Sequence, residues 1–247
     1  MKNATKFTIF ATFALALSAC GKSEHPGSAN DAEKASGKAE VTTNALAKAA
    51  SPEIKLPQAD KAMADDKYTE IDSGTQLAYL YYAISGMPVD YEKLAGIISG
   101  DYRNTTNAFK KEEILQSLKP KIDQQIGFYK DNRYVVIDTD FRMSHIDMAS
   151  KSFPINGVPA GKSYLYFADS SSYKLGVTNG EAFSKYKAAS DDQARMIEGL
   201  VEKYNANGKA KIFLYAQDAD MNSGVVKFQA VKVQLKLQDG SALPDMI

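Results

Sequence analysis

A change of hydrophobic periodicity near Arg133 constrains the fold more than any other feature of this sequence. Before it, apolar residues recur every three or four positions, which is typical of helices packed by one face. After it, they recur every second position, which is typical of strands with one buried face. Short turns and one-sided alternation in this second part indicate antiparallel pairing. We therefore predict an α+β fold: N-terminal helices followed by a mainly antiparallel sheet with one helical insertion.

The helical part is expected at residues 67–130. Apolar spacing and end signals predict helices from Ser73 to Gly86, from Asp90 to Ser99, and from Asn107 to Pro120. We expect Gly100 to end the second helix. Pro120 should kink the third helix or begin a new one, because proline removes a backbone donor but is welcome in a first turn.

The sheet part is expected at residues 131–247. Strands are predicted at residues 133–143, 164–167, 173–177, 210–217 and 225–237. The second and third of these should form a hairpin. A helical insertion is expected from Glu181 to Tyr204, broken near Ser190. In the first strand, Ile137 and Phe141 fall on one face and Asp138, Asp140 and Arg142 on the other, so one face should be exposed to solvent.

The amino terminus has the pattern of a secretion signal. Lys2 and Lys6 precede an apolar run from Phe7 to Ala19, which is too short to cross roughly 30 Å of hydrocarbon but has the length of a signal-peptide core. The run ends in Leu17-Ser18-Ala19-Cys20, which resembles the lipobox of bacterial lipoproteins. The resemblance implies that residues 1–19 are removed, and that Cys20 carries diacylglycerol and an acylated (palmitate-type) amino terminus.

The alternative is an ordinary signal peptide that precedes an unmodified cysteine. Cys20 is the only cysteine in 247 residues, and an unpaired thiol is a liability in an oxidising compartment, which favours acylation. Gly21 follows, where lipoproteins retained in the inner membrane commonly have aspartate. The resemblance thus implies a lipid-anchored envelope protein whose partner is the bilayer, with the outer membrane favoured over the inner membrane.

Composition predicts a tether between the anchor and the domain. Residues 20–66 are rich in Ala, Lys, Ser, Glu and Asp with few large apolar residues, so we expect a disordered segment that is dispensable for folding. Residues 67–247 should then form a single α+β domain.

Cleavage removes two of the 30 basic residues and leaves 28 against 30 acidic ones, a net charge near minus two that excludes a nucleic-acid footprint. Two histidines and one cysteine exclude a zinc cluster, and no cofactor is expected.

Three motifs suggest chemistry. His145 could be a general base oriented by Asp147, with Asp138 and Asp140 nearby to bind a cation. In a regular strand, however, His145 and Asp147 share one face, and Asp138 and Asp140 share the other. The alternative is a solvated ladder of charges.

Asp218, Asp220 and Asn222 resemble the first half of a calcium loop, but the glycine and the closing glutamate of such loops are absent, and an ordinary hairpin turn explains the residues as well. Gly157-Val158-Pro159-Ala160-Gly161-Lys162-Ser163 resembles a phosphate-binding loop but leads into a strand instead of a helix.

The domain after the tether resembles uncharacterised bacterial lipoprotein domains, especially from Asn107-Ala108-Phe109-Lys110-Lys111 to Leu118-Lys119-Pro120 and Ile122. This resemblance implies no residue roles. We therefore expect a membrane-anchored envelope lipoprotein that acts as a non-enzymatic binding or structural module for an envelope protein or a cell-wall component. The alternative is a periplasmic hydrolase that uses His145 with nearby carboxylates.

Overall fold

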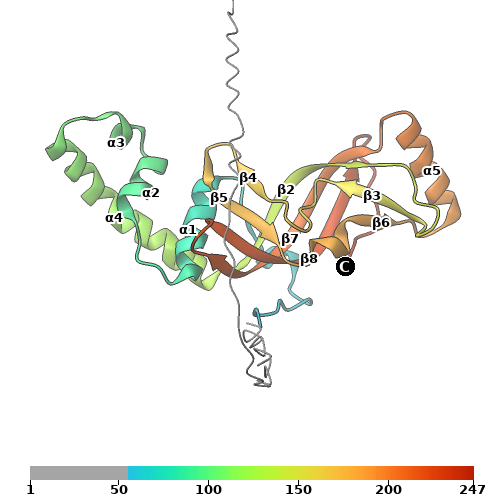
Figure 1. The fold of residues 1–247 in the computed structure, drawn as a ribbon, viewed down its shortest axis with the longest axis horizontal. Helices are drawn as coiled ribbons and strands as arrows, with labels where there is room; N and C mark the ends of the chain where they lie inside the picture. The colour runs from blue at the N-terminus through green and yellow to red at the C-terminus, as the bar shows by residue number, and fades with distance from the viewer. Residues whose placement is uncertain (1–54) are drawn as a thin grey trace, which may run out of the picture. The chain divides into compact units, whose positions relative to one another are not determined.

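A computed structural model describes residues 55–247 of the chain, which fold as five α-helices and an eight-stranded sheet (Figure 1). The predicted α+β class is confirmed. The elements are η1 (Asp65–Lys67), β1 (Thr69–Glu70), α1 (Gly74–Ser85), α2 (Tyr91–Ile98), α3 (Gly100–Asn104), α4 (Ala108–Asp131), β2 (Tyr134–Met143), β3 (Ser152–Asn156), β4 (Leu165–Phe167), β5 (Ser170–Val177), η2 (Gly180–Phe183), β6 (Lys185–Lys187), α5 (Asp191–Glu202), β7 (Asn207–Asp220) and β8 (Val225–Leu237). The expected signal peptide, Cys20 and most of the expected tether lie outside the described residues.

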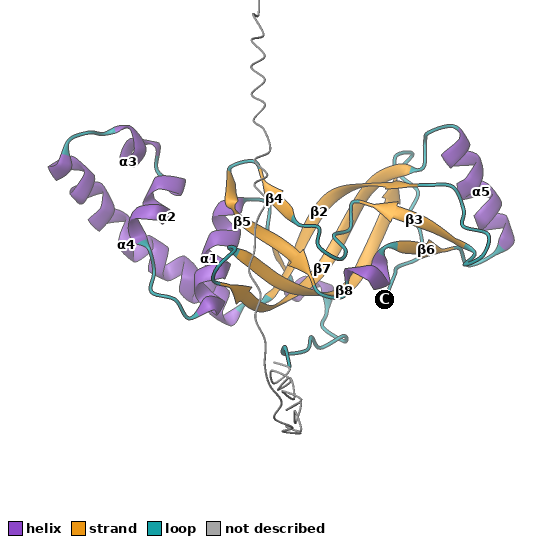
Figure 2. Ribbon diagram, viewed as in Figure 1, coloured by secondary structure: helices purple, strands orange, loops and turns teal. Residues whose placement is uncertain are grey.

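The sheet is built around three long strands, β2, β7 and β8. Its order is β4-β5-β8-β7-β2-β3-β6, and β1 adds to β2 (Figure 2). Most neighbours are antiparallel, as predicted, but β1 with β2 and β5 with β8 pair in parallel. Alternate residues of the three long strands, such as Ile137, Ile212 and Val233, point into one continuous core.

Helix α1 packs directly on this sheet. Ser73 and Gln76 form a reciprocal capping box at its start, and Gly86 ends it in the left-handed conformation with φ of 68°. Leu77 and Leu80 are fully buried where α1 contacts β5, β7 and β8. The helix predicted from Ser73 to Gly86 is confirmed, because its end signals are local.

Helices α2 and α4 contact α1, and α3 contacts α2 and α4, beside the sheet (Figure 1). Gly100, expected to end the second helix, instead begins α3. Ser99 explains this, because its N–H bonds to Ala95 O at the end of α2 while its hydroxyl accepts from Tyr102 N at 3.1 Å. Of the two outcomes expected at Pro120, a kink or a new helix, the new helix is wrong, because α4 continues through Pro120 as one helix.

The region predicted as a helical insertion contains less helix than expected. Residues Gly180–Phe183 form a 3₁₀ turn, Lys185–Lys187 form edge strand β6 against β3, and only α5 is an α-helix. Tertiary pairing overrides the helical pattern, because the strand buries Tyr186 beside Phe183 in the core. The predicted hairpin is confirmed as β4 and β5, although β5 begins at Ser170.

The predicted boundary at residue 66 needs correction, because the preceding segment is docked on the sheet. The described residues from Lys55 onward belong to one compact unit. The carbonyl of Pro57 accepts from Gln217 Nε2 at 2.7 Å, and Ala59 N donates to Gln229 Oε1 at 2.8 Å. Composition does not predict this docking, because the segment has little apolar surface and is held largely by hydrogen bonds.

The docked segment leads into Tyr68, which lies on the second face of the sheet, the face opposite the core. The Tyr68 ring meets those of Tyr134 and Phe213 edge-on, at centroid distances of 5.4 and 5.0 Å. Burial, helped by the neighbouring Tyr134, raises the pKa of Tyr68 to about 12. Tyr68 therefore covers part of this face, whereas Asp138, Asp140 and Arg142 of β2 are exposed on the same face. None of the helices in residues 55–247 has both the length and the apolar composition needed to cross a bilayer.

Candidate binding site

The structure places His145 beside Glu198 of α5, not beside Asp147. His145 Nδ1 lies 2.6 Å from Glu198 Oε1, and Ile146 N donates to Glu198 Oε2 at 3.0 Å. The pKa of Glu198 is lowered, chiefly by its hydrogen bond with His145. The His145 side chain is 70% exposed, so its imidazole lies largely in solvent. The expectation of a base oriented by Asp147 is wrong in its geometry.

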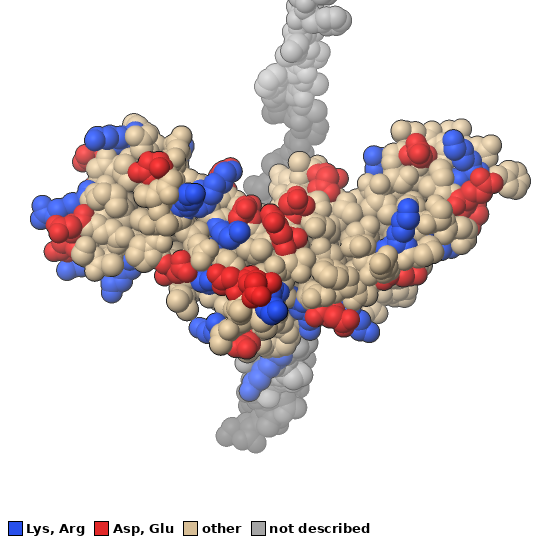
Figure 3. Space-filling view, turned by 180° about the vertical axis from the view of Figure 1, so that it is seen from behind, with Lys and Arg blue, Asp and Glu red and all other residues tan. Residues whose placement is uncertain are grey.

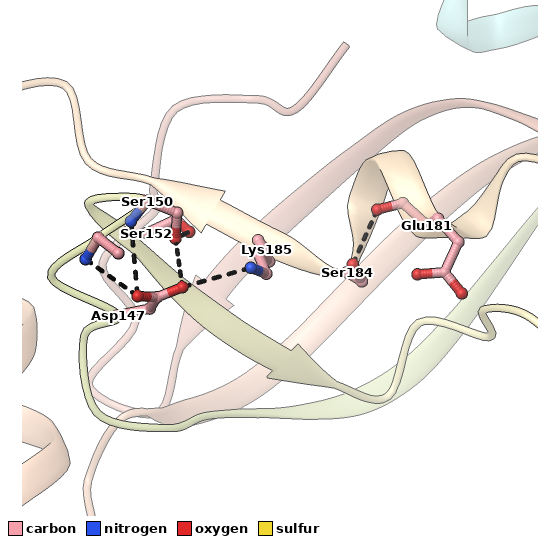
Figure 4. A network of polar contacts seen from close by, with 7 residues as sticks. Asp147, Ser150, Ser152, Glu181, Ser184 and Lys185 are labelled. Carbon is pink, nitrogen blue, oxygen red and sulfur yellow. Dashed lines mark hydrogen bonds and ion pairs between the residues drawn. The ribbon is translucent and has the colours of Figure 1, made fainter.

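Asp147 instead organises the turn that leads into β3 (Figure 4). Its carboxylate accepts from Ala149 N at 3.0 Å and from Ser150 Oγ at 2.7 Å, and Lys185 Nζ lies 3.4 Å away. The bond from Ser150 is the main reason that the pKa of Asp147 is lowered. Its acceptors are thus occupied by the turn.

The loop with the calcium-like spacing is a hairpin turn between β7 and β8. Asp218 pairs with Lys227 across the strands at 2.9 Å. Asp220 accepts from Asn222 N at 2.9 Å and from Ser223 Oγ at 2.7 Å, bonds that close the turn. Among residues 55–247, no group of three or more His, Cys, Asp or Glu side chains is placed to hold a metal ion.

The glycine-rich loop at residues 157–163 likewise bonds to itself. Ala160 N donates to Ser163 Oγ at 2.8 Å, and Ser163 N donates to Ala160 O at 3.1 Å. The next regular element is strand β4, so no helix N-terminus follows to hold a phosphate.

The structure does bring charged side chains together on the exposed part of the second sheet face, the face opposite the core. We call this surface the charged face; it comprises Asp138, Asp140, Arg142, Lys209, Lys211, Gln234 and Lys236. Strand register makes these charged side chains neighbours. Between β2 and β7, Asp138 lies opposite Lys211 and Asp140 lies opposite Lys209; between β7 and β8, Lys209 lies opposite Lys236. The solvent-exposed alternation predicted for β2 is confirmed here.

A groove of about 760 Å³ lies on this face where β2, β7 and β8 meet the end of β3. Three glycines contribute to its wall, and two of them allow close strand approach: a Cβ on Gly157 would lie 2.1 Å from Asp140 O, and one on Gly208 would lie 2.0 Å from Lys236 O. A second hollow of about 410 Å³ shares Lys209 and Lys236 with it. The two together form an extended, shallow site.

Cations outnumber available carboxylates on the charged face. Lys209 pairs with Asp140 at 2.6 Å, and this bond raises the lysine pKa. Within the described part of the chain, Arg142, Lys211 and Lys236 make no ion pair, and Asp138 is the remaining acid of the face. Asp245 at the rim accepts from Gln234 Nε2 at 3.1 Å and lies 3.9 Å from Lys232. The site therefore suits a ligand with negative groups.

Sequence reasoning did not identify the lysines of β7 and β8 as part of a site. The available signal was the alternation of lysines with buried residues around Lys209 and Lys236. Over the surface as a whole, acidic and basic residues are interspersed, as Figure 3 shows for one side, in keeping with a net charge of zero. Only strand register shows which charges share a face.

Comparison with known proteins adds no assignment to this geometry. No family model, no curated protein and no solved structure matches the chain.

Proposed function

We propose that this protein is a lipid-anchored envelope lipoprotein that acts as a non-enzymatic binding module, and that the charged face binds an anionic envelope component, either a protein or a cell-wall polymer. The observation that carries the proposal is the groove of about 760 Å³ lined by Arg142, Lys209 and Lys236. The anchor itself rests on the resemblance of Leu17 to Cys20 to a lipobox.

The shape and composition of the face support binding over catalysis. The cations are exposed on rigid strands whose other face is core, so binding requires no rearrangement of the scaffold. Exposed lysines act as point charges that attract anions and steer association, with an effect that salt weakens. The site is also shallow and spread over two hollows, a form that fits an extended ligand.

The test is a double charge reversal, Lys211→Glu with Lys236→Glu, in the full-length lipoprotein. Both side chains are exposed, so the fold should persist. Two assays run in parallel: sedimentation with purified cell-wall sacculi, and cross-linking to proteins in native envelopes. The matched control is Lys121→Glu with Lys130→Glu, which makes the same charge change on exposed positions of α4.

We expect the double reversal to weaken one of the two interactions by roughly tenfold or more, since each reversed contact contributes on the order of 1 kcal/mol. The control pair should bind as the unchanged protein does. Equal binding by both variants in both assays would contradict the proposal. Replacing His145 with alanine addresses the hydrolase alternative, because a binding module should bind as before.

A further inference from the structure

A second surface, which shares no lining residue with the charged face, has the form of a docking groove. It lies between helix α5 and the turn that joins β2 to β3, and its volume is about 560 Å³. We call it the α5 groove. Its apolar lining comprises Ile146, Met148, Ala188, Ala189 and Ala194, and Met148 is 74% exposed.

The α5 groove is held open by hydrogen bonds between its two walls. The Glu198 carboxylate of α5 binds both His145 and the backbone N–H of Ile146, which ties the helix to the opposite turn. Local bonds fix the start of α5 itself: Ser190 Oγ accepts from Gln193 N at 3.1 Å, and Ala189 N donates to Gln193 Oε1 at 2.6 Å. The groove is therefore formed before any partner arrives, which lowers the entropic cost of binding.

Cations surround the apolar lining. Lys151, Lys187 and Arg195 all contribute to the groove and are exposed, and none of them makes an ion pair with another residue of the described segment. Two acids also line it. The Glu198 carboxylate already accepts hydrogen bonds from His145 and from Ile146 N. Of the two acids that line the groove, only Asp191 lacks such bonds to the opposite turn.

We propose that the α5 groove binds a segment of a partner protein in which an apolar side chain is flanked by carboxylates. The apolar lining would take the side chain, and the three cations would pair with the carboxylates. Met148 suits such a role, because methionine is flexible and adapts to the shape of an apolar ligand. A concave groove of this size fits one or two side chains of a peptide better than the flat surface of a bilayer.

This proposal goes beyond binding at the charged face, because it places a second contact on other elements of the fold. The two surfaces share no lining residue. A protein with both could hold an anionic component on the sheet while its α5 groove engages a partner protein. Each surface can be changed without altering the other, so the two proposals can fail separately.

The experiment measures peptide binding to the full-length lipoprotein in phosphatidylcholine nanodiscs by fluorescence polarisation. The probe is a fluorescein-labelled hexapeptide of alternating Glu and Leu. Two comparison peptides replace Glu by Lys or Leu by Ser. The test variants are Lys187→Glu with Arg195→Glu, and Met148→Ser. The control variants are the pair Lys211→Glu with Lys236→Glu on the charged face.

We expect the Glu and Leu peptide to bind at least about tenfold more tightly than either comparison peptide, because it alone offers both features. The groove charge reversal should weaken it by roughly tenfold and Met148→Ser by a smaller factor, while the charged-face variants keep the original affinity. Equal affinity for the three peptides would overturn the proposal, as would an equal loss in the charged-face variants. Loss of peptide binding when phosphatidylglycerol is added to the nanodiscs would assign the groove to anionic lipid instead and would also overturn it.

Discussion

Asp169 joins the β4–β5 hairpin to the start of helix α1, and its removal tests how the helical part is held on the sheet. Its carboxylate accepts from Gly74 N at 2.7 Å, from Thr75 N at 3.1 Å and from Thr75 Oγ1 at 3.2 Å. These N–H groups lie in the first turn of α1, where they have no partner within the helix. Asp169 thus acts as a second cap, 95 positions along the chain from Gly74.

We expect Asp169→Ala to lower the free energy of unfolding by about 1 to 2 kcal/mol. Loss of a capping side chain costs typically about 1 kcal/mol, and a carboxylate at a helix N-terminus adds roughly 0.3 to 1 kcal/mol through the helix dipole. The solvent exposure of Asp169 keeps the figure in this lower range. For a domain of this size the melting temperature should fall by about 2 to 8 °C. Asp169→Asn should lose less, because its amide oxygen still accepts one bond.

The stabilisation that Asp169 contributes depends on pH in a defined direction. Partial burial opposes the shift, but the hydrogen bonds from Gly74 and Thr75 hold the pKa of Asp169 below its usual value. A carboxylate with a lowered folded-state pKa stabilises the fold above its unfolded pKa of about 3.9 and ceases to do so as the pH falls through the folded value. The difference between the unchanged protein and Asp169→Ala should therefore be constant from about pH 6 to 8 and shrink below about pH 4.

Thermal melts followed by circular dichroism between pH 3 and pH 8 measure this difference. Asp131→Ala is the control, because Asp131 is an exposed last residue of α4 and should change the melting temperature little. A melting temperature of Asp169→Ala within about 1 °C of the unchanged protein at neutral pH would refute the capping argument. A loss that stays the same in acid would refute the electrostatic part alone.

Three further predictions test the boundary, the strand packing and the anchor. A chain that starts at Asp66 should melt several degrees below one that starts at Lys55, as measured by calorimetry, because it lacks the Pro57 carbonyl that binds Gln217; equal melting temperatures would restore the boundary predicted from composition. Gly208→Ala should destabilise the protein by about 2 kcal/mol or more in urea unfolding, because its Cβ would lie 2.0 Å from a backbone oxygen. The control is Gly96→Ala in helix α2, where a Cβ meets no atom within 4 Å, and this change should stabilise the protein by roughly 0.5 to 1 kcal/mol. Cys20→Ser should abolish incorporation of labelled palmitate; label that persists in this variant would disprove the lipobox interpretation.

Local signals predicted much of the fold. Helix α1 and strand β8 follow the sequence closely, since capping residues, glycines and period-two alternation act within a few positions of one another. The open face of β2 was also predictable, because side chains of a strand alternate between its two faces. His145 and Asp147 show the limit of this reasoning. They are close in sequence, but Glu198 from a distant helix and the local turn decide their partners.

Other features depend on contacts between distant parts of the chain. Strand β6 replaces a predicted helical segment because β3 offers it pairing and the core accepts Tyr186. The docking of Pro57 requires the side chain of Gln217, 160 positions away. The charged face likewise exists only when β7 lies between β2 and β8, since register sets which lysine meets which carboxylate. The sequence by itself determined the ends of helix α1, the strand alternation and the fold class. Tertiary structure decided the pairing partners and the two grooves, because these depend on which segments meet in space.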